Sequence, residues 1–273
     1  MDGKDRPTIG IIGGSGLYRF FDDAGEREVA TPYGPPSSAV AIGSVEVAGG
    51  PRSVAFVSRH GPGHAFPAHR VNYRANLWAL RKVGVRQVIA PCAVGSLRAD
   101  LGPGSLVVPD QLVDRTTSRV QTYFDAGACH VGFADPYCPR LRWELLERLG
   151  AAGAEVVDGG TMVVVEGPRF STRAESQWFA AQGWSLVNMT GHPEAVLARE
   201  LGLCYSAVAL VTDFDAGLAA GEGVSQADVF AVFGAHVERL RALLSDVVGG
   251  LPLEQTCECT RVHDGMTLPI ELP

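Results

Sequence analysis

The stretch YSAVALVTDFD (Tyr205–Asp215) carries the two features that decide how this chain folds and where it acts. Tyr205–Thr212 is an almost wholly apolar run, which predicts a buried strand. Asp213 and Asp215 stand at its end with one residue between them. Because residues two apart in an extended chain point to the same side, we expect both carboxylates to face one ligand.

Strand and helix patterns alternate over the rest of the chain. Further strands are predicted at Thr8–Ile12, Val40–Val47, Ser53–Ser58, Gln87–Ala90, Leu106–Pro109, Thr161–Glu166 and Leu186–Asn188. Helices are predicted at Val71–Val83, Pro139–Ala152 and Pro193–Leu201, and after the capping-box patterns Thr172-x-x-Glu175 and Ser225-x-x-Asp228. This alternation predicts a single α/β domain over residues 1–273, with a mixed central β-sheet flanked by helices on both sides.

The composition narrows the classes of partner. The chain has 273 residues, 46% of them apolar, and a formal charge of −7. The net negative charge argues against binding to nucleic acid, which requires a positively charged surface. No apolar run has the length of a membrane span. The first residues, MDGKDRPTIGIIGG, lack the apolar core of a signal peptide, so we expect a cytoplasmic protein that binds no membrane.

Six cysteines in a chain of this length do not form a disulfide scaffold. Four stand singly in the sequence and are expected to be reduced: Cys92, Cys129, Cys138 and Cys204. Cys257 and Cys259 form a C-x-C pair, but structural zinc usually takes four ligands, so no metal site is predicted. The pair is either a local redox site or two bystander thiols, and we favour bystanders.

Five polar or glycine-rich segments follow predicted strands, at the ends where open α/β sheets bind their ligands. They are Gly13–Gly16, Ser58–Gly61, Cys92–Ser96, Asn188–Gly191 and Thr212–Asp215. Considered singly, the first is interpreted as a tight turn, the third as a loop and the fourth as a turn beside a core methionine. The second and fifth carry functional hypotheses of their own.

Those two segments bear side chains suited to chemistry. Arg59 offers a planar fork of donors for phosphate, and His60 can donate beside it; a surface arginine and a structural histidine fit the pattern equally well. Asp213 and Asp215, as neighbouring acids in a partly buried site, would keep one carboxyl protonated, as a general acid requires. A solvated acidic turn is the alternative, and the spacing is not that of a calcium loop.

Ten motifs occur in one order along nearly the whole chain: IGIIGGSGLY, TPYGPPS, SRHGPGH, VNYRANLWAL, GSLR, PDQLVDRT, ADPYCP, EGPRFSTRAES, NMTGHPEAVLARE and VTDFD. Together they resemble the methylthioadenosine phosphorylase branch of the trimeric purine nucleoside phosphorylases. The resemblance implies a nucleoside phosphorylase-like fold, a homotrimer, and phosphorolysis of S-methyl-5′-thioadenosine or a closely related 5′-substituted adenosine. The products would be adenine and 5-methylthioribose 1-phosphate. Inorganic phosphate is then the co-substrate, and no metal or organic cofactor is expected.

The resemblance also assigns residues to subsites. The phosphate site that it implies is Ser15, Arg59, His60, Cys92, Ala93 and Thr190. The family often has threonine in place of Cys92, whose thiol is a weak donor. The nucleoside site that it implies is Phe170, Asn188, Met189, Asp213, Asp215, Gln226, Val229 and Phe230, with His130 lent by a neighbouring subunit.

Within this implied site the two acids are catalytic. Asp213 would protonate N7 of the leaving base, and Asp215 would orient that contact or bond the exocyclic amine. Relatives that prefer 6-oxopurines typically carry asparagine at the first position, so Asp213 favours adenine. Val229 and Phe230 form an apolar wall that suits a methylthio group. Gln226 stands where the family often has an apolar residue, which leaves 5′-deoxy, 5′-halo and longer thio groups open.

Plainer alternatives stand beside these assignments. Phe170, Val229 and Phe230 also fit as core residues of helices, and His130 as an ordinary surface histidine, while His64 is expected to be structural. The rival functions within the class are an S-methyl-5′-thioinosine phosphorylase and a hydrolytic nucleosidase. The rival from another class is a non-catalytic nucleotide-binding protein built around Gly13–Gly16.

Overall fold

The computed structural model describes residues 6–47, 50–216 and 223–273. In this part of the chain eleven strands form one mixed sheet. The strands are β1 (Ile9–Gly13), β2 (Gly25–Arg27), β3 (Val40–Val45), β4 (Arg52–Ser58), β5 (Gln87–Ser96), β6 (Leu106–Val108), β7 (Gln111–Arg115), β8 (Val156–Asp158), β9 (Thr161–Val165), β10 (Leu186–Asn188) and β11 (Cys204–Asp213). Their order is β2-β3-β4-β1-β5-β10-β9-β7, and a branch adds β11 to β5, β6 to β11 and β8 to β6.

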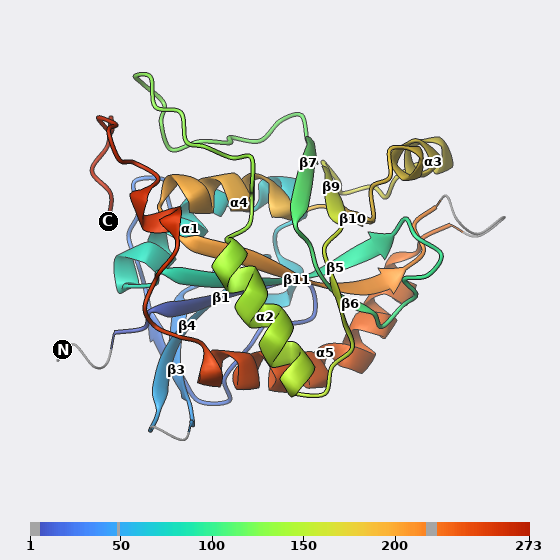
Figure 1. Ribbon diagram of the computed structural model, residues 1–273, viewed down its shortest axis with the longest axis horizontal. Coiled ribbons are helices and arrows are strands. Elements are labelled where there is room, and N and C mark those ends of the chain that lie inside the picture. The colour runs from blue at the N-terminus through green and yellow to red at the C-terminus, as the bar shows by residue number, and fades with distance from the viewer. Residues whose placement is uncertain (1–5, 48–49, 217–222) are drawn as a thin grey trace.

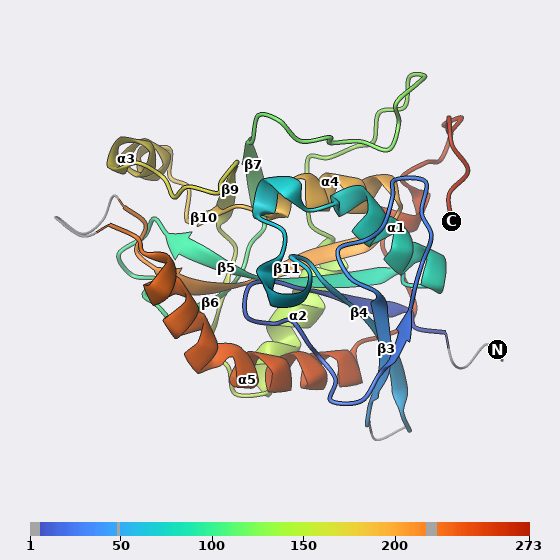
Figure 2. The same ribbon diagram turned by 180° about the vertical axis from the view of Figure 1, so that it is seen from behind.

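Helices cover both faces of this sheet. They are α1 (Tyr73–Val83), α2 (Pro139–Ala151), α3 (Arg173–Ala181), α4 (Gly191–Glu200) and α5 (Gln226–Gly250). Figure 1 shows α1 and α4 over one face and α2 and α5 over the other, and Figure 2 shows the same layers from behind. The predicted α/β architecture is confirmed. No helix among the described residues has both the length and the apolar character to cross a membrane.

Two apolar layers hold the helices to the sheet. One packs Leu77 and Leu80 of α1 and Leu197 of α4 against the strands. The other packs α2 and α5 against the opposite face, where Leu244 of α5 is fully buried. Burying a large apolar side chain contributes about 1.5–3 kcal/mol, so these layers supply the main stabilisation of the fold.

β5 and β11 form the spine of the sheet, because they pair in parallel register up to Asp213 opposite Gly95. The segment Cys92–Ser96, expected to be a loop, is instead the second half of β5. β11 pairs with one of its edges and β10 pairs antiparallel with the other. This pairing satisfies backbone donors and acceptors, which the small side chains do not reveal. A register shift between Val211 and Asp213 re-aims the end of β11, as bulges do.

Three strands were missed by the sequence analysis: β2, β7 and β8. All three lie at the margins of the sheet, where each pairs with a single neighbour among the described strands. They are half-buried or exposed. Their residues therefore lack the continuous apolar run by which the central strands were recognised.

The helix starts follow the predicted capping patterns to different degrees. Thr172 and Glu175 form a complete capping box at α3. At α5 the Ser225 hydroxyl oxygen accepts from the Asp228 backbone N–H, and its hydrogen goes to the Asp228 carboxylate. The first turn of α5 is not packed into the core, and this leaves its side chains free to line a cavity.

Candidate active site

A cavity of about 300 Å³ opens at the carboxyl ends of β4, β5, β10 and β11, beside the first turn of α5. Fourteen of the fifteen predicted site residues line it: Ser15, Arg59, His60, Cys92, Ala93, Phe170, Asn188, Met189, Thr190, Asp213, Asp215, Gln226, Val229 and Phe230. His130 does not line it in the single chain and is exposed. The size is typical of a small-molecule site, and segments far apart in the sequence meet there.

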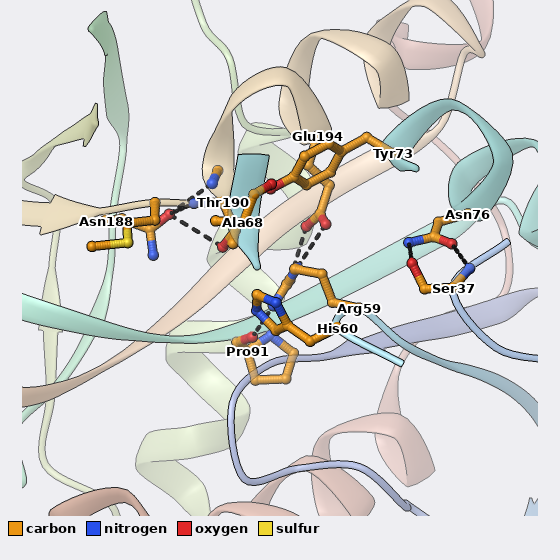
Figure 3. A network of polar contacts seen from close by, with 12 residues as sticks. Ser37, Arg59, His60, Ala68, Tyr73, Asn76, Pro91, Asn188, Thr190 and Glu194 are labelled. Carbon is orange, nitrogen blue, oxygen red and sulfur yellow. Dashed lines mark hydrogen bonds and ion pairs between the residues drawn. The ribbon is translucent and has the colours of Figure 1, made fainter. Parts of the chain in front are cut away.

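Arg59 is the most buried cation of the cavity wall, with 1% of its side chain exposed. Its Nε lies 2.7 Å from Glu194 Oε2 and its Nη2 lies 2.9 Å from Glu194 Oε1, a bidentate pair (Figure 3). Nη1 donates to the Pro91 carbonyl at 3.1 Å. Burial alone would lower the pKa of Arg59, but the Glu194 carboxylate outweighs it and raises that pKa. The interpretation of Arg59 as a surface arginine is wrong.

The Arg59 guanidinium has donors left for a ligand. Arginine carries five N–H hydrogens, and Glu194 and Pro91 take three of them. The two that remain, one on Nη1 and one on Nη2, belong to a side chain that borders the cavity. Tyr205 also donates to Glu194 at 2.8 Å, so the carboxylate that fixes the arginine is itself held in place.

His60 presents an acceptor to the cavity at neutral pH. Its Nδ1 lies 2.9 Å from the Phe66 carbonyl oxygen, which only accepts, so Nδ1 carries the hydrogen. Burial, then the charge of Arg59 and the neighbouring His64, lower the pKa of His60 to about 3. The ring is therefore neutral with a bare Nε2, and the expectation that His60 donates to phosphate needs correction. Bare Nε2 fits the O–H of a hydrogen phosphate ion.

His64, expected to be structural, also borders the cavity. Its ring stacks on His60 with centroids 4.2 Å apart, and meets the Phe230 ring edge-on at 5.8 Å. Tyr18 lies within hydrogen-bond distance of its Nδ1, at 3.2 Å. His64 adopts a left-handed backbone conformation, with φ of 61°, which is uncommon outside glycine. It links His60 to the wall formed by α5.

The turn after β1 brings the backbone close to the Arg59 guanidinium. A Cβ atom at Gly14 would lie 2.9 Å from both Arg59 Nη1 and the Pro91 carbonyl oxygen, so only glycine fits there. Beside it, burial raises the pKa of Cys92 to about 12, and the thiol is neutral. The interpretation of Gly13–Gly16 as an ordinary tight turn omits this contact.

Asn188 organises the segment that carries Thr190. Its Oδ1 accepts from the backbone N–H groups of Thr190 and Gly191, each at 2.7 Å (Figure 3). Its Nδ2 donates to the Ala93 carbonyl at 3.1 Å. Although Asn188 borders the cavity, these three bonds make it a group that positions the turn.

Asp213 lies against Gly95 of β5, four residues beyond the Pro91 that Arg59 contacts, and its proton is held more tightly than that of a free carboxyl. Burial, with a smaller contribution from the charge of Asp215, raises its pKa to about 6, against the lowering effect of the Thr212 hydroxyl. The Thr212 hydroxyl oxygen lies 2.8 Å from Asp213 Oδ2 and 3.2 Å from the Val94 carbonyl. Its single hydrogen can serve only one of them. A protonated Asp213 donating to Thr212 lets Thr212 donate to Val94, and both contacts are then satisfied.

Asp215 is 3% exposed, so the interpretation of this segment as a solvated acidic turn is wrong. Burial raises its pKa, against the lowering effect of the hydroxyl of Ser176, which donates to its Oδ2. Both acids lie close to the backbone of Gly95. A Cβ there would lie 3.0 Å from Asp213 Oδ1 and 3.1 Å from the Asp215 Cβ.

The remaining wall is mainly apolar. Val229 and Phe230 are half-buried and line the cavity from the first turn of α5, with Gln226 at its start. Phe170 precedes α3 and also lines the cavity, as does Met189. The interpretation of Phe170, Val229 and Phe230 as helix core is therefore wrong.

Sequence reasoning assigned no role to three residues that hold the site together: Glu194, Thr212 and Ser176. Glu194 carried a signal, since an acid in the apolar run PEAVLA of α4 is costly to bury without a partner. Thr212 and Ser176 carried none, because hydroxyl residues are common in strands and helix starts. Their partners become visible only when the chain is folded.

The sequence and the fold both match known proteins. Residues 8–249 match the model of the family described as the phosphorylase superfamily. The chain is 59% identical over 266 residues to the S-methyl-5′-thioadenosine phosphorylase of Mycolicibacterium smegmatis, covering 97% of this chain and 99% of that relative. It is 57% identical over 284 residues to the purine nucleoside phosphorylase of Streptomyces coelicolor, covering 100% of each. The methylthioadenosine phosphorylase from Schistosoma mansoni in complex with adenine superposes with a TM-score of 0.86 at 37% identity, covering 91% of this chain and 93% of that one.

Proposed function

This chain belongs to the phosphorylase superfamily, and we propose that its cavity cleaves S-methyl-5′-thioadenosine with inorganic phosphate. The products are adenine and 5-methylthioribose 1-phosphate. One observation carries the proposal beyond family membership: a charge-compensated arginine and a pair of acids with raised pKa border the same cavity. Phosphorolysis of a purine nucleoside requires a group that binds phosphate and a group that protonates the leaving base.

The reaction exchanges one bond at C1′ for another. The bond from C1′ to N9 of adenine breaks, its electron pair goes to the base, and positive charge develops on the ribose. A phosphate oxygen then forms the new bond to C1′. Phosphate held beneath the sugar stabilises the developing charge and is already placed for attack.

The part of the cavity around Arg59 and His60, here called the anion end, holds that phosphate. The two remaining N–H groups of Arg59, the Ser15 hydroxyl and Thr190 donate to its oxygens, and backbone near Ala93 approaches it. His60 Nε2 accepts the O–H of the hydrogen phosphate ion. The neutral thiol of Cys92 adds at most a weak donor, so the other groups carry the binding.

The part of the cavity around Asp213 and Asp215, here called the acid end, releases the base. Protonated Asp213 hands its proton to N7 as adenine departs, and Asp215 bonds the exocyclic amine and keeps the purine in line. A general acid of this kind accelerates a reaction by about 10²–10⁴-fold. Its proton must be present near the working pH, as the raised pKa of Asp213 allows.

The wall between the two ends selects the sugar. Phe170 packs on the base, Met189 lies against the nucleoside, and Val229 with Phe230 surrounds the 5′ group. A 5′-hydroxyl left without a partner there costs about 1–3 kcal/mol, whereas a methylthio group is well accommodated. Gln226 marks the outer limit of this pocket.

The assembly completes the site in this proposal. His130 is exposed and does not line the cavity of its own chain, and the resemblance assigns it to the 5′ pocket of a neighbouring copy. We place the chain in a homotrimer on the resemblance described above. Inorganic phosphate acts as co-substrate, and no step requires a cofactor.

A second candidate is a phosphorylase of 6-oxopurine nucleosides. The relative from Streptomyces coelicolor bears the name purine nucleoside phosphorylase, which specifies neither base nor sugar. A carboxyl at position 213 favours the amino group and N7 of adenine. The test is turnover of S-methyl-5′-thioadenosine, S-methyl-5′-thioinosine and adenosine at one saturating phosphate concentration. We expect the first to have the highest kcat/KM, and a preference for the inosine compound would overturn the base assignment.

A further inference from the structure

Four of the six cysteines meet in space at a point that the catalytic cavity does not include. The sulfurs of Cys138, Cys204, Cys257 and Cys259 all lie within 4.8 Å of one another. The sequence analysis treated Cys138 and Cys204 as single thiols and the C-x-C pair as bystanders. The fold gathers all four sulfurs into one cluster, which neither interpretation anticipated.

Three separate elements deliver these sulfurs. Cys138 is the N-cap of α2, and Cys204 is the first residue of β11. Cys257 is the N-cap of the 3-10 helix Glu258–Arg261, and Cys259 lies within that helix. Backbone bonds fix the first two: the Cys138 N–H donates to Tyr205 O and the Cys204 N–H donates to Arg86 O, both at 2.9 Å. Cys138, Cys204 and Cys259 are almost completely buried and Cys257 is half-buried.

The spacing of the sulfurs matches a tetrahedral metal. Zinc binds thiolate at about 2.3 Å, which puts tetrahedral sulfur atoms about 3.8 Å apart. Sulfurs within 4.8 Å of one another reach that distance through small side-chain rotations. The Cys204 and Cys257 sulfurs are 3.2 Å apart and would separate slightly on binding the ion. Four sulfur ligands in this geometry select zinc or iron over harder metals.

The surroundings of the cluster stabilise negative sulfur. The Leu141 N–H lies 3.4 Å from the Cys138 sulfur, at the first turn of α2, and Gln255 Nε2 lies 3.1 Å from the Cys204 sulfur. Donors of this kind typically hold metal-bound thiolates in place.

Arg140 supplies the compensating charge. Its Nη2 lies 3.6 Å from the Cys204 sulfur, and its Nε and Nη1 are buried without a partner among the described residues. A zinc ion with four thiolates carries a net charge of −2. A half-buried cation with spare, buried donors beside the cluster offsets part of that charge.

We propose that Cys138, Cys204, Cys257 and Cys259 bind one zinc ion in a closed, structural site. Binding replaces the thiol protons with four zinc–sulfur bonds and releases the protons to solvent, so no oxidant is needed. The ion ties the C-terminal segment after α5 to the start of β11. Because β11 is ten residues long, its other end, which carries Asp213, is about 30 Å away. The site therefore affects stability and leaves the chemistry of the cavity unchanged.

The first test is metal content. Full-length protein purified in a reducing, chelator-free buffer and analysed by inductively coupled plasma mass spectrometry should hold one zinc per chain. After denaturation with a chelator, all six thiols should react. An absence of zinc with six reactive thiols would overturn the proposal. Only two reactive thiols would also overturn it, because the cluster would then form two disulfides. Iron in place of zinc would overturn it as well.

Variants separate the cluster from the other thiols. Cys257→Ser, in the half-buried position, should lower zinc content at least tenfold, and Cys259→Ser should do the same. Cys129→Ser, outside the cluster, is the matched control and should keep one zinc per chain. A chelator should lower the Tm of the wild type and of the control but not of Cys257→Ser. One zinc per chain in Cys257→Ser would contradict the assignment, and so would a chelator effect that survives in this variant.

Phosphorolysis provides the check on folding. At a temperature well below its Tm, Cys257→Ser should retain kcat/KM within about twofold of the wild type, since the ion lies far from the reacting atoms. Zinc loss accompanied by normal turnover identifies a structural site. Tenfold loss of kcat in folded, zinc-free protein would contradict a purely structural role.

Discussion

The two ends of the cavity handle charge in opposite ways. At the anion end, Arg59 and Glu194 are both 1% exposed and permanently paired, so the positive charge is set in place before any ligand arrives. At the acid end, burial raises the pKa of Asp213 and of Asp215, so each carboxyl holds its proton to a higher pH than a free carboxyl does. The difference shows that one buried site can favour an ion and a neutral acid, according to the partner that each group has.

The comparison also explains which contacts are rigid. The guanidinium of Arg59 has a bidentate partner and a carbonyl acceptor, and Glu194 receives a further bond from Tyr205. Asp213 has one hydroxyl beside it. In the proposed reaction, the group that binds the anion in every cycle is held by several bonds, and the group that loses and regains a proton is held by few.

Replacing Arg59 should give the largest effect. Arg59→Ala leaves Glu194 buried and unpaired, which costs about 3–5 kcal/mol of folding free energy, and it removes the main cation for phosphate. We expect a lower urea midpoint and no saturation by phosphate. The double variant Arg59→Met/Glu194→Gln should recover most of the stability without the activity. Normal phosphate saturation in the double variant would remove Arg59 from the anion site.

Replacing the acid at the other end should leave stability intact and damage turnover. Asp213→Asn keeps the shape but cannot give a proton to N7, so kcat for S-methyl-5′-thioadenosine should fall about 10²–10⁴-fold. Phosphate affinity should be unchanged, since the anion end is untouched. Ser176→Ala, which loosens Asp215 only, is the control and should lose less. Full turnover by Asp213→Asn would refute the general-acid role.

The pH dependence should follow the same acid. Because the pKa of Asp213 is raised to about 6 from an ordinary value of 3.8, its proton is held more tightly in the folded chain than in the unfolded one. Its contribution to stability is complete below the ordinary value and is lost as pH rises through 6. kcat/KM should likewise decline above pH 6, by about tenfold per unit at most. Asp213→Asn should lack this limb, and phosphate ionisation, common to both proteins, cancels in their ratio.

The smallest effect should come from the wall between the two ends. Val229→His adds a donor beside the 5′ position, so the ratio of adenosine to S-methyl-5′-thioadenosine turnover should rise about tenfold. Val229→Leu keeps the wall apolar and should leave the ratio unchanged. An equal rise in both variants would show that space, and not hydrogen bonding, sets the selection.

Much of this arrangement was predictable from the chain. Central strands such as β11 carry continuous apolar runs, and their ends locate the cavity by a general rule of α/β sheets. The marginal strands β2, β7 and β8 gave no such run, and Cys92–Ser96 is extended only because two neighbours pair with it.

The unpredicted parts of the site depend on contacts between distant segments. Glu194 is 135 residues from Arg59 in sequence. The assignment of the His60 hydrogen to Nδ1 depends on the Phe66 carbonyl that accepts it. The thiol cluster shows the same limit, because the C-x-C pair was interpreted as two bystander thiols and the fold brings the sulfurs of Cys138 and Cys204 beside it. Residue types identified the chemistry, and tertiary structure identified the partners.

The most direct test of the account is release of adenine from S-methyl-5′-thioadenosine by phosphate-free enzyme, with and without added phosphate. We predict no release beyond a trace without phosphate, and stoichiometric formation of 5-methylthioribose 1-phosphate with it. Equal release under both conditions, with free 5-methylthioribose as the product, would make the protein a hydrolase and contradict the anion site built around Arg59.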